Sequence, residues 1–205
     1  MAYVALVAAS LCAVLRCALG QYLFSMLTTL LCALAVSASG SVPQKVALIA
    51  GLLVSIVADW YLAHQKAGEH MFLYGVMGFF VAHGLFAWYA LPRYSYHLSV
   101  LVIALILLAG YGVYLFVRIM PHVDGVLKVP VLLYLLISIL SLYFALSMNA
   151  PTWERILYIA GIVAILASDT MIAEGDFAGN KAADGLMLPL YYLCHILISL
   201  SAVLR

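Results

Sequence analysis

Long apolar runs, separated by short polar breaks, make up almost the whole chain. A helix that spans a bilayer needs about 20 predominantly apolar residues, and eight runs approach that length. They are roughly 2–19, 22–39, 46–63, 71–91, 97–117, 129–148, 156–173 and 185–204. Proline, glycine and charged residues fill the breaks, as at Ser39–Pro43, Leu91–Arg93, Asn149–Pro151 and the polar stretch Glu174–Asp184. The pattern predicts an all-α polytopic membrane protein with eight transmembrane helices.

Composition supports a membrane protein and excludes several other classes. Of 205 residues, 68% are hydrophobic and 8% are charged, whereas soluble domains are about 45–50% apolar and about 25% charged. A net charge of +1 provides no basic surface for a nucleic-acid backbone. We therefore expect one transmembrane domain over residues 1–205, integral and multi-pass, in the inner membrane if the source is bacterial. The first run has no basic residue before it, so we expect a membrane helix there and not a cleaved signal peptide.

An internal repeat is visible at an offset of 110 residues, where Gly51–Ala63 aligns with Gly161–Ala173. The alignment places Asp59 on Asp169. With four predicted helices in each half, both halves cross the membrane in the same direction, which makes the repeat parallel and not inverted. The predicted halves are about 1–92 and 97–205.

Two carboxyl groups stand out because they lie inside predicted spans. Asp59 and Asp169 each lie about four residues before the end of a helix, roughly 6 Å inside it at 1.5 Å per residue. A charge at the centre of a span costs about 2.5–3.5 kcal/mol on insertion scales, and such residues usually face the bundle interior. The other acidic residues fall in loops or at helix ends: Glu69, Asp124, Glu154, Glu174, Asp176 and Asp184.

Because the two helices run in parallel, both carboxyls are expected at the same depth. Two carboxyls in a poorly solvated site do not both ionise comfortably and would hold one proton between them. That arrangement suits general acid–base catalysis and equally suits proton-coupled transport. The structural alternative is a pair of aspartates that cap neighbouring helices or reach the headgroups.

Other polar side chains lie near these aspartates. Tyr191, Tyr192 and His195 share a face of the last span by their spacing, while Tyr74 and His83 occupy the matching fourth span. The nine lysines and arginines divide four to five between the two membrane faces, so the positive-inside rule favours neither orientation. On the aspartate-bearing face, Lys128 or Arg118 could bind a phosphate headgroup.

No metal and no cofactor is expected. The chain has no HxxxH or HxxE spacing and no CxxC pair among its four cysteines. A metallohydrolase of the ceramidase type would need three converging histidines, and only His83 and His195 lie well within predicted spans.

Six segments of the chain follow one another in a recognisable order: Gly51–Ala63, Phe72–Gly75, Phe79–His83, Val129–Tyr134, Gly161–Ala173 and Tyr191–Tyr192. Taken in this order, they resemble the YhhN-like family of integral membrane proteins, the lysoplasmalogenases. The chain departs from the family at two points. The second helix begins Gly20-Gln21-Tyr22-Leu23 where the family usually has Lys-Pro, and His195 stands where the family tends to have Gln.

The resemblance implies an eight-helix enzyme that cleaves the vinyl ether bond of lysoplasmalogens, which enter from the bilayer. The products would be a fatty aldehyde and glycerophospho-ethanolamine or -choline. It implies that Asp59 and Asp169 are catalytic. We expect the substrate to be bound by a set of residues near these aspartates or on their side of the membrane, namely Tyr74, His83, Lys128, Tyr134, Ser168, Tyr191, Tyr192 and His195. The alternative is a proton-coupled transporter of small solutes or lipids built around the Asp59/Asp169 pair, against which stand the parallel halves and the absence of obvious Gly/Pro-broken spans near the carboxyls.

Overall fold

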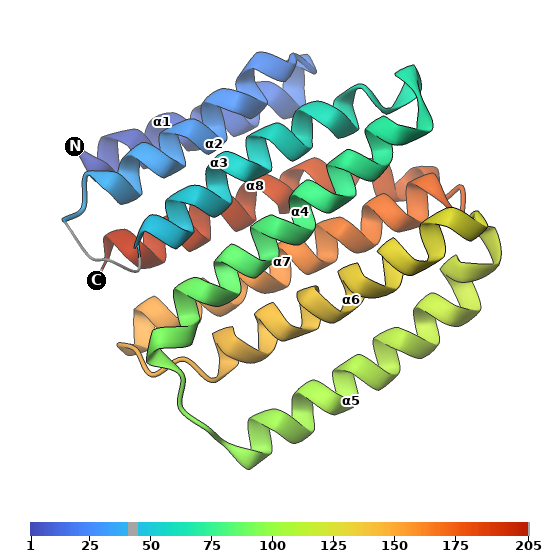
Figure 1. The fold of residues 1–205 in the computed structure, drawn as a ribbon. Coiled ribbons are helices and arrows are strands. Elements are labelled where there is room, and N and C mark those ends of the chain that lie inside the picture. The colour runs from blue at the N-terminus through green and yellow to red at the C-terminus, as the bar shows by residue number, and fades with distance from the viewer. Residues whose placement is uncertain (41–44, 205) are drawn as a thin grey trace.

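The computed structural model describes residues 1–40 and 45–204 as one helical bundle (Figure 1). Within those residues there are eight α-helices and no β-strand, which confirms the all-α prediction. The helices are α1 (Ala2–Leu19), α2 (Tyr22–Ser37), α3 (Lys45–Ala63), α4 (Glu69–Ala90), α5 (Leu98–Tyr114), α6 (Gly125–Leu146), α7 (Thr152–Asp176) and α8 (Lys181–Val203).

Seven helices of the described residues are long and apolar enough to cross a membrane, all except α2. With 16 residues, α2 is about 24 Å long at 1.5 Å per residue, short of the roughly 30 Å of a hydrocarbon core. The protein is therefore a multi-pass membrane protein, and the eighth span stays a prediction. Spans can only be helices or closed barrels in lipid, because every backbone N–H and C=O must bond within the protein.

The helix ends differ from the predicted ones at the second half of the chain. Helices α6 and α8 each begin four residues earlier than predicted and continue through Pro130 and Pro189. Membrane helices tolerate such prolines because neighbouring groups satisfy the freed carbonyl. The side chain of Asn180 accepts a hydrogen bond from the Ala182 N–H at 3.3 Å and so caps α8. Of the predicted break at Ser39–Pro43, residues 41–43 lie outside the described part of the chain.

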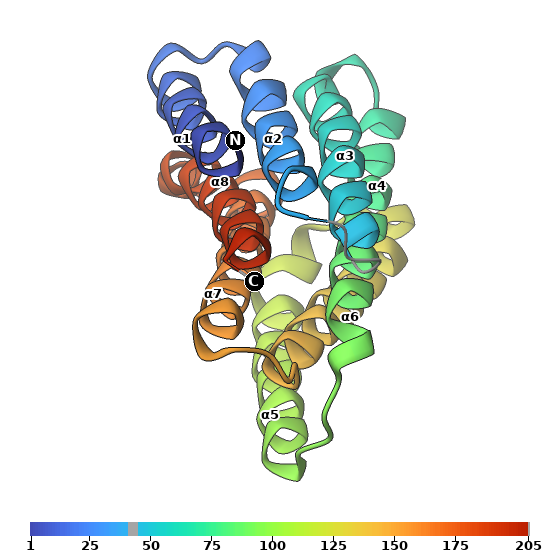
Figure 2. The ribbon, with the colours of Figure 1, turned by 90° about the vertical axis from the view of Figure 1, so that its left-hand side faces the viewer.

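Helix packing gives the bundle a central part and an edge (Figure 2). Helices α2, α3 and α4 each pack on the helix before them, and so do α6, α7 and α8. The first and second four-helix sets meet where α4 packs on α6 and where α8 packs on α1 and α2. Helix α5 lies at the edge, packs mainly on α6 and has one buried residue, Ala104.

Glycines allow the closest helix approach, between α7 and α8. A Cβ atom on Gly161 would lie 2.6 Å from Ile198 Cγ1 and 3.2 Å from the Cys194 carbonyl oxygen. In α4, a Cβ on Gly78 would lie 2.8 Å from the Cβ of Ala58 on α3. Small residues let membrane helices approach at backbone distance, which maximises their packing.

Helix α7 carries the buried acidic groups that hold the bundle together laterally. Near its start, Glu154 forms an ion pair with Arg93, which follows α4, and accepts a hydrogen bond from Tyr89 at 3.3 Å. In its last turn, Glu174 pairs with Arg118, which follows α5. Both glutamates occupy helix ends as predicted, yet both are buried, which the sequence pattern did not indicate.

Candidate functional site

The end of the bundle that lies away from both chain termini (Figure 1) is called here the distal end. Two adjoining cavities lie toward this end, and each is lined by one of the two predicted aspartates. That end is formed by the last turns of α1, α3, α5 and α7 and the first turns of α2, α4, α6 and α8. The aspartates come from α3 and α7. On the same two helices, Gly51 lies against Phe86 of α4 and Gly161 lies against Ile198 of α8, which lets each pair of helices pack closely.

The cavity beside Asp59, called here the polar cavity, encloses about 950 Å³. Its wall includes Arg16 of α1, Ser25 of α2 and Tyr192 of α8. Ser25 Oγ donates a short hydrogen bond to Asp59 Oδ2, and the Tyr192 hydroxyl donates to Ser25 Oγ at 2.8 Å. A relay of two hydroxyls therefore orients the Asp59 carboxyl, and the Arg16 guanidinium acts on it as a nearby positive charge. Asp176, the last residue of α7, also lines this cavity.

The cavity beside Asp169, called here the apolar cavity, has a volume of about 670 Å³, which includes space open to the outside. Asp169 Oδ2 lies 3.0 Å from Nε2 of His83, whose side chain is fully buried. Tyr134 lines the same cavity, and its ring packs edge-on against His83 with centroids 5.3 Å apart. The rest of the wall is mostly apolar and includes Phe72, Val76, Leu115, Val131, Leu135 and Phe177.

Three side chains, Leu62, Phe79 and Ile172, line both cavities, so the two spaces adjoin. The aspartates thus lie on either side of a shared wall. Each carboxyl has its own hydrogen-bond partner, Ser25 for Asp59 and His83 for Asp169. The predicted dyad with one shared proton therefore becomes, in the structure, two neighbouring carboxyls with separate hydrogen-bond networks.

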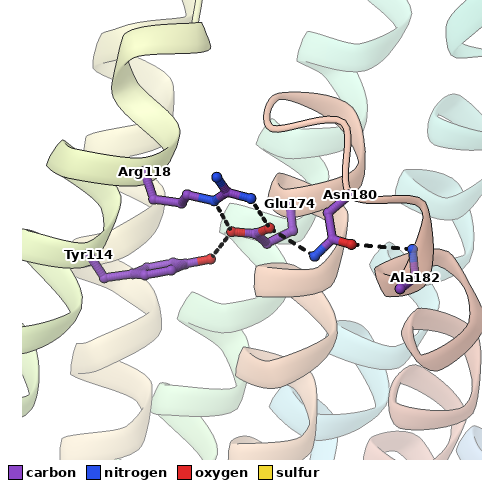
Figure 3. Close-up of polar contacts among 5 residues, drawn as sticks. All are labelled: Tyr114, Arg118, Glu174, Asn180 and Ala182. Atoms are coloured by element: carbon purple, nitrogen blue, oxygen red, sulfur yellow. Dashed lines mark hydrogen bonds and ion pairs between the residues drawn. The ribbon is translucent and has the colours of Figure 1, made fainter.

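A polar cluster around Glu174 joins α7 to α5, to the segment that follows α5 and to the residue that precedes α8 (Figure 3). Glu174 accepts hydrogen bonds from the Tyr114 hydroxyl at 2.5 Å, from Arg118 Nε at 3.2 Å and from Asn180 Nδ2 at 3.0 Å. One turn earlier, the hydroxyls of Tyr111 and Thr170 lie 2.8 Å apart. These bonds fasten the edge helix α5 to α7. Arg118, one of the two predicted phosphate ligands, is engaged by Glu174 here.

Of the predicted substrate-binding residues, four line the cavities. Ser168, Tyr191 and Tyr192 line the polar cavity, and Tyr134 lines the apolar one. A fifth, His83, contacts the cavity residue Asp169. Ser168 Oγ also donates to the Met187 carbonyl oxygen at 3.0 Å and joins α7 to α8.

Three predicted residues are not brought to either cavity. His195 is fully buried one turn beyond Tyr191, where its Nδ1 lies 3.0 Å from Thr29 Oγ1. The Tyr74 side chain is 51% exposed on the outer face of α4. Lys128 is exposed in the first turn of α6. In each case the helix rotation, which the sequence does not specify, points the side chain elsewhere.

The sequence argument missed several polar residues of the polar cavity, among them Arg16, Ser25 and Asp176. Arg16 entered only the charge balance between the two membrane faces, and Asp176 was placed in a loop or at a helix end. For Ser25 a signal was present, since Tyr22, Ser25 and Thr29 recur at helical spacing and form a polar face on an otherwise apolar run.

Metal-ligand geometry is absent from residues 1–40 and 45–204 as described, since no group of three or more His, Cys, Asp or Glu side chains could hold an ion. The two buried histidines have different partners, Asp169 for His83 and Thr29 for His195.

Comparison with known proteins gives one match. No curated protein and no solved structure matches the chain. The model of the YhhN family matches residues 20–202, a range that holds both aspartates and all eight predicted substrate-binding residues. The chain therefore belongs to the YhhN family.

Proposed function

We propose that this protein hydrolyses the vinyl ether bond of lysoplasmalogens, giving a fatty aldehyde and glycerophospho-ethanolamine or -choline. One observation carries the proposal: a polar cavity and an apolar cavity adjoin, and an aspartate lines each of them. A single-chain phospholipid has a matching division into a charged head and an apolar chain, with the vinyl ether bond where they meet.

The apolar cavity suits the alkenyl chain. Its aromatic and aliphatic wall offers no charged group except Asp169 among the described residues, and pockets for apolar ligands are lined mainly by such side chains. The headgroup would occupy the polar cavity, close to the distal end of the spans. The shared wall of Leu62, Phe79 and Ile172 would then flank the reacting atoms.

Vinyl ether hydrolysis needs an acid, an anion and a water molecule. A proton is added to the β-carbon, the electron pair of the double bond forms the new C–H bond, and an oxocarbenium ion remains. Water adds to this cation and releases a proton, and the resulting hemiacetal collapses to aldehyde and alcohol. One water is consumed and the acid is regenerated, which parallels the two-carboxyl logic of glycosidases.

The different surroundings of the two carboxyls suggest their roles. We assign proton donation to Asp169, because it lines the cavity for the alkenyl chain and His83 fixes its orientation at 3.0 Å. Asp59 would stabilise the cation and position water, because Ser25 and Tyr192 orient it within the polar cavity. Both roles need preorganised groups in a site of low dielectric constant.

We also propose that the bundle consists of two parallel four-helix units. Asp59 on α3 accepts a hydrogen bond from Ser25 of the preceding helix α2, and Asp169 on α7 lines a cavity together with Tyr134 of the preceding helix α6. The last helix of each unit reaches the other unit, since Tyr192 of α8 bonds Ser25 and His83 of α4 bonds Asp169.

Aldehyde release from lysoplasmenyl-ethanolamine by the purified protein in detergent tests the proposed activity. Asp59→Asn and Asp169→Asn should each lower the rate by about 10²- to 10⁴-fold, the usual size of an acid–base contribution. Asp124→Asn, the same change at an exposed residue outside both cavities, should keep the full rate. Full activity in both correctly inserted cavity variants would refute the mechanism.

Two further outcomes separate the alternatives. Aldehyde release that a chelator abolishes would indicate a metal-dependent hydrolase. No release from either the ethanolamine or the choline substrate by well-folded protein would refute the hydrolase and favour the proton-coupled transporter, which reconstituted vesicles would then test.

A further inference from the structure

The polar cavity carries an arrangement of charge that the hydrolysis chemistry does not use. Its described charged residues are Arg16, Asp59 and Asp176. Asp59 belongs to the proposed reaction, whereas Arg16 and Asp176 lie on α1 and α7 and have no role in it. We propose that Arg16 and Asp176 form a headgroup subsite that selects lysophospholipids bearing both a phosphate and an ammonium group. This inference rests on the proposed function.

Arg16 is suited to the phosphate. It is half-buried, and its Nε–H is buried with no hydrogen-bond acceptor among the described residues. Buried polar groups normally have a partner, and a phosphate oxygen is the acceptor that matches the guanidinium fork. No other lysine or arginine within the described ranges lines either cavity. A phosphate in the polar cavity therefore has one cation to bind.

Asp176 is suited to the ammonium group because of its position. It ends α7 seven residues after Asp169, which is about 10 Å farther along the axis at 1.5 Å per residue. Its side chain is exposed at the rim of the polar cavity, outside the apolar region. Arg16 thus lines the polar cavity near Asp59, and the Asp176 carboxylate lies at its rim. We place the phosphate at Arg16 and the amine at Asp176, because the phosphate of the lipid lies between the vinyl ether and the amine.

The charges also explain what the subsite would reject. A headgroup with phosphate and no amine would bring unpaired negative charge toward Asp176 and Asp59. Specificity of this kind comes from repulsion of the wrong ligand as much as from attraction of the right one. The subsite should therefore prefer zwitterionic headgroups over lysoplasmenic acid, which has the phosphate alone.

The test uses three vinyl ether substrates that differ only in the head: lysoplasmenyl-ethanolamine, lysoplasmenic acid and 1-alkenylglycerol, which has neither charge. Arg16→Gln should lower kcat/KM about 10- to 100-fold more for the two phosphate substrates than for 1-alkenylglycerol, the size of a charge-assisted hydrogen bond. Asp176→Asn should reduce the preference for ethanolamine over lysoplasmenic acid about 2- to 5-fold, as for an exposed ion pair. Arg155→Gln and Asp124→Asn are matched controls, because both residues are exposed and line neither cavity.

The series of heads also separates binding of phosphate from an indirect effect on Asp59. If Arg16→Gln lowers hydrolysis of 1-alkenylglycerol as much as that of the phosphate substrates, the residue acts through Asp59 and the subsite is refuted. Unchanged headgroup preference in both variants, with hydrolysis intact, would refute the subsite and leave the proposed function standing.

A binding measurement keeps the two proposals distinguishable. The saturated alkyl ether analogue of the ethanolamine substrate has no vinyl bond to cleave, and its affinity can be measured by thermal shift. Weaker binding of this analogue to Arg16→Gln than to wild type would support the subsite even in the absence of hydrolysis. Equal binding would refute it. Competition by soluble glycerophosphoethanolamine would show that the subsite binds the free headgroup, and competition by the alkyl lipid alone would show that the chain is required.

Discussion

The ion pair between Glu154 and Arg93 predicts a large loss of stability when one partner is neutralised. Glu154 is 1% exposed and Arg93 is 11% exposed. The Arg93 guanidinium also lies 4.6 Å above the centroid of the Tyr89 ring. The pair joins the end of α4 to the start of α7, far from both cavities. Glu154→Gln should therefore change stability without touching the proposed site.

The magnitude follows from the charge that is left behind. Removing one partner of a buried ion pair costs about 3–5 kcal/mol, because the remaining charge is uncompensated in a poorly solvated place. Glu174→Gln is the matched comparison on the same helix. Its partner Arg118 is 53% exposed, so the remaining cation stays solvated and the loss should be about 1 kcal/mol or less. The two Glu→Gln changes should differ by about 2 kcal/mol or more.

Unfolding in mixed micelles, followed by circular dichroism, measures this difference. At about 2–4 °C per kcal/mol for a chain of this size, Glu154→Gln should lower the midpoint by roughly 6–20 °C and Glu174→Gln by no more than about 4 °C. A double change of Glu154→Gln with Arg93→Met should recover part of the loss, because no unpaired charge remains. Equal midpoints for the two single variants would show that burial of the partner does not set the cost.

Two other predictions concern His83 and Gly161. His83→Gln should lower kcat about tenfold with little change in KM in the aldehyde assay, because it frees the Asp169 carboxyl to rotate without altering the cavity walls. An effect on KM alone would contradict the role of His83 in positioning Asp169. Gly161→Val should destabilise the bundle by about 1–3 kcal/mol, since its Cβ would lie 2.6 Å from Ile198, whereas Gly110→Val, with nothing within 4 Å, should leave the unfolding midpoint nearly unchanged.

The fold followed closely from the sequence because the bilayer leaves few choices. Every described helix lies within a few residues of a predicted apolar run, since lipid forces such runs to be helical. The errors occur where that constraint weakens. Polar residues continue α7 to Asp176, and α6 and α8 pass through Pro130 and Pro189. At those ends the helix extends beyond the apolar pattern, so hydropathy no longer marks its limits.

The candidate site was only half predictable, for a different reason. Asp59 and Asp169 could be identified from one helix at a time, because a carboxyl inside a span is costly wherever it points. Arg16 and Glu174 could not, because their importance depends on which helix packs beside them. Arg118 and Glu174 are 56 residues apart in the chain, and apolar periodicity says nothing about such pairings. The rotations that carried Tyr74, Lys128 and His195 away from the cavities are set by the same packing.

The two proposed four-helix units surround their aspartates with different chemistry. Asp59 accepts a hydrogen bond from the hydroxyl of Ser25, which in turn accepts one from Tyr192. Asp169 lies 3.0 Å from the imidazole of His83 and lines a mostly apolar cavity. Two further charged residues, Arg16 and Asp176, line the cavity of Asp59, whereas none accompanies Asp169 among the described residues. Identical carboxyls acquire distinct tasks only through such differences in environment. Replacing an orienting residue should therefore lower the rate of aldehyde release more than replacing an aspartate by glutamate. Asp59→Glu and Asp169→Glu each keep a carboxyl in the site. Ser25→Ala and His83→Gln leave the aspartate in place without the group that orients it.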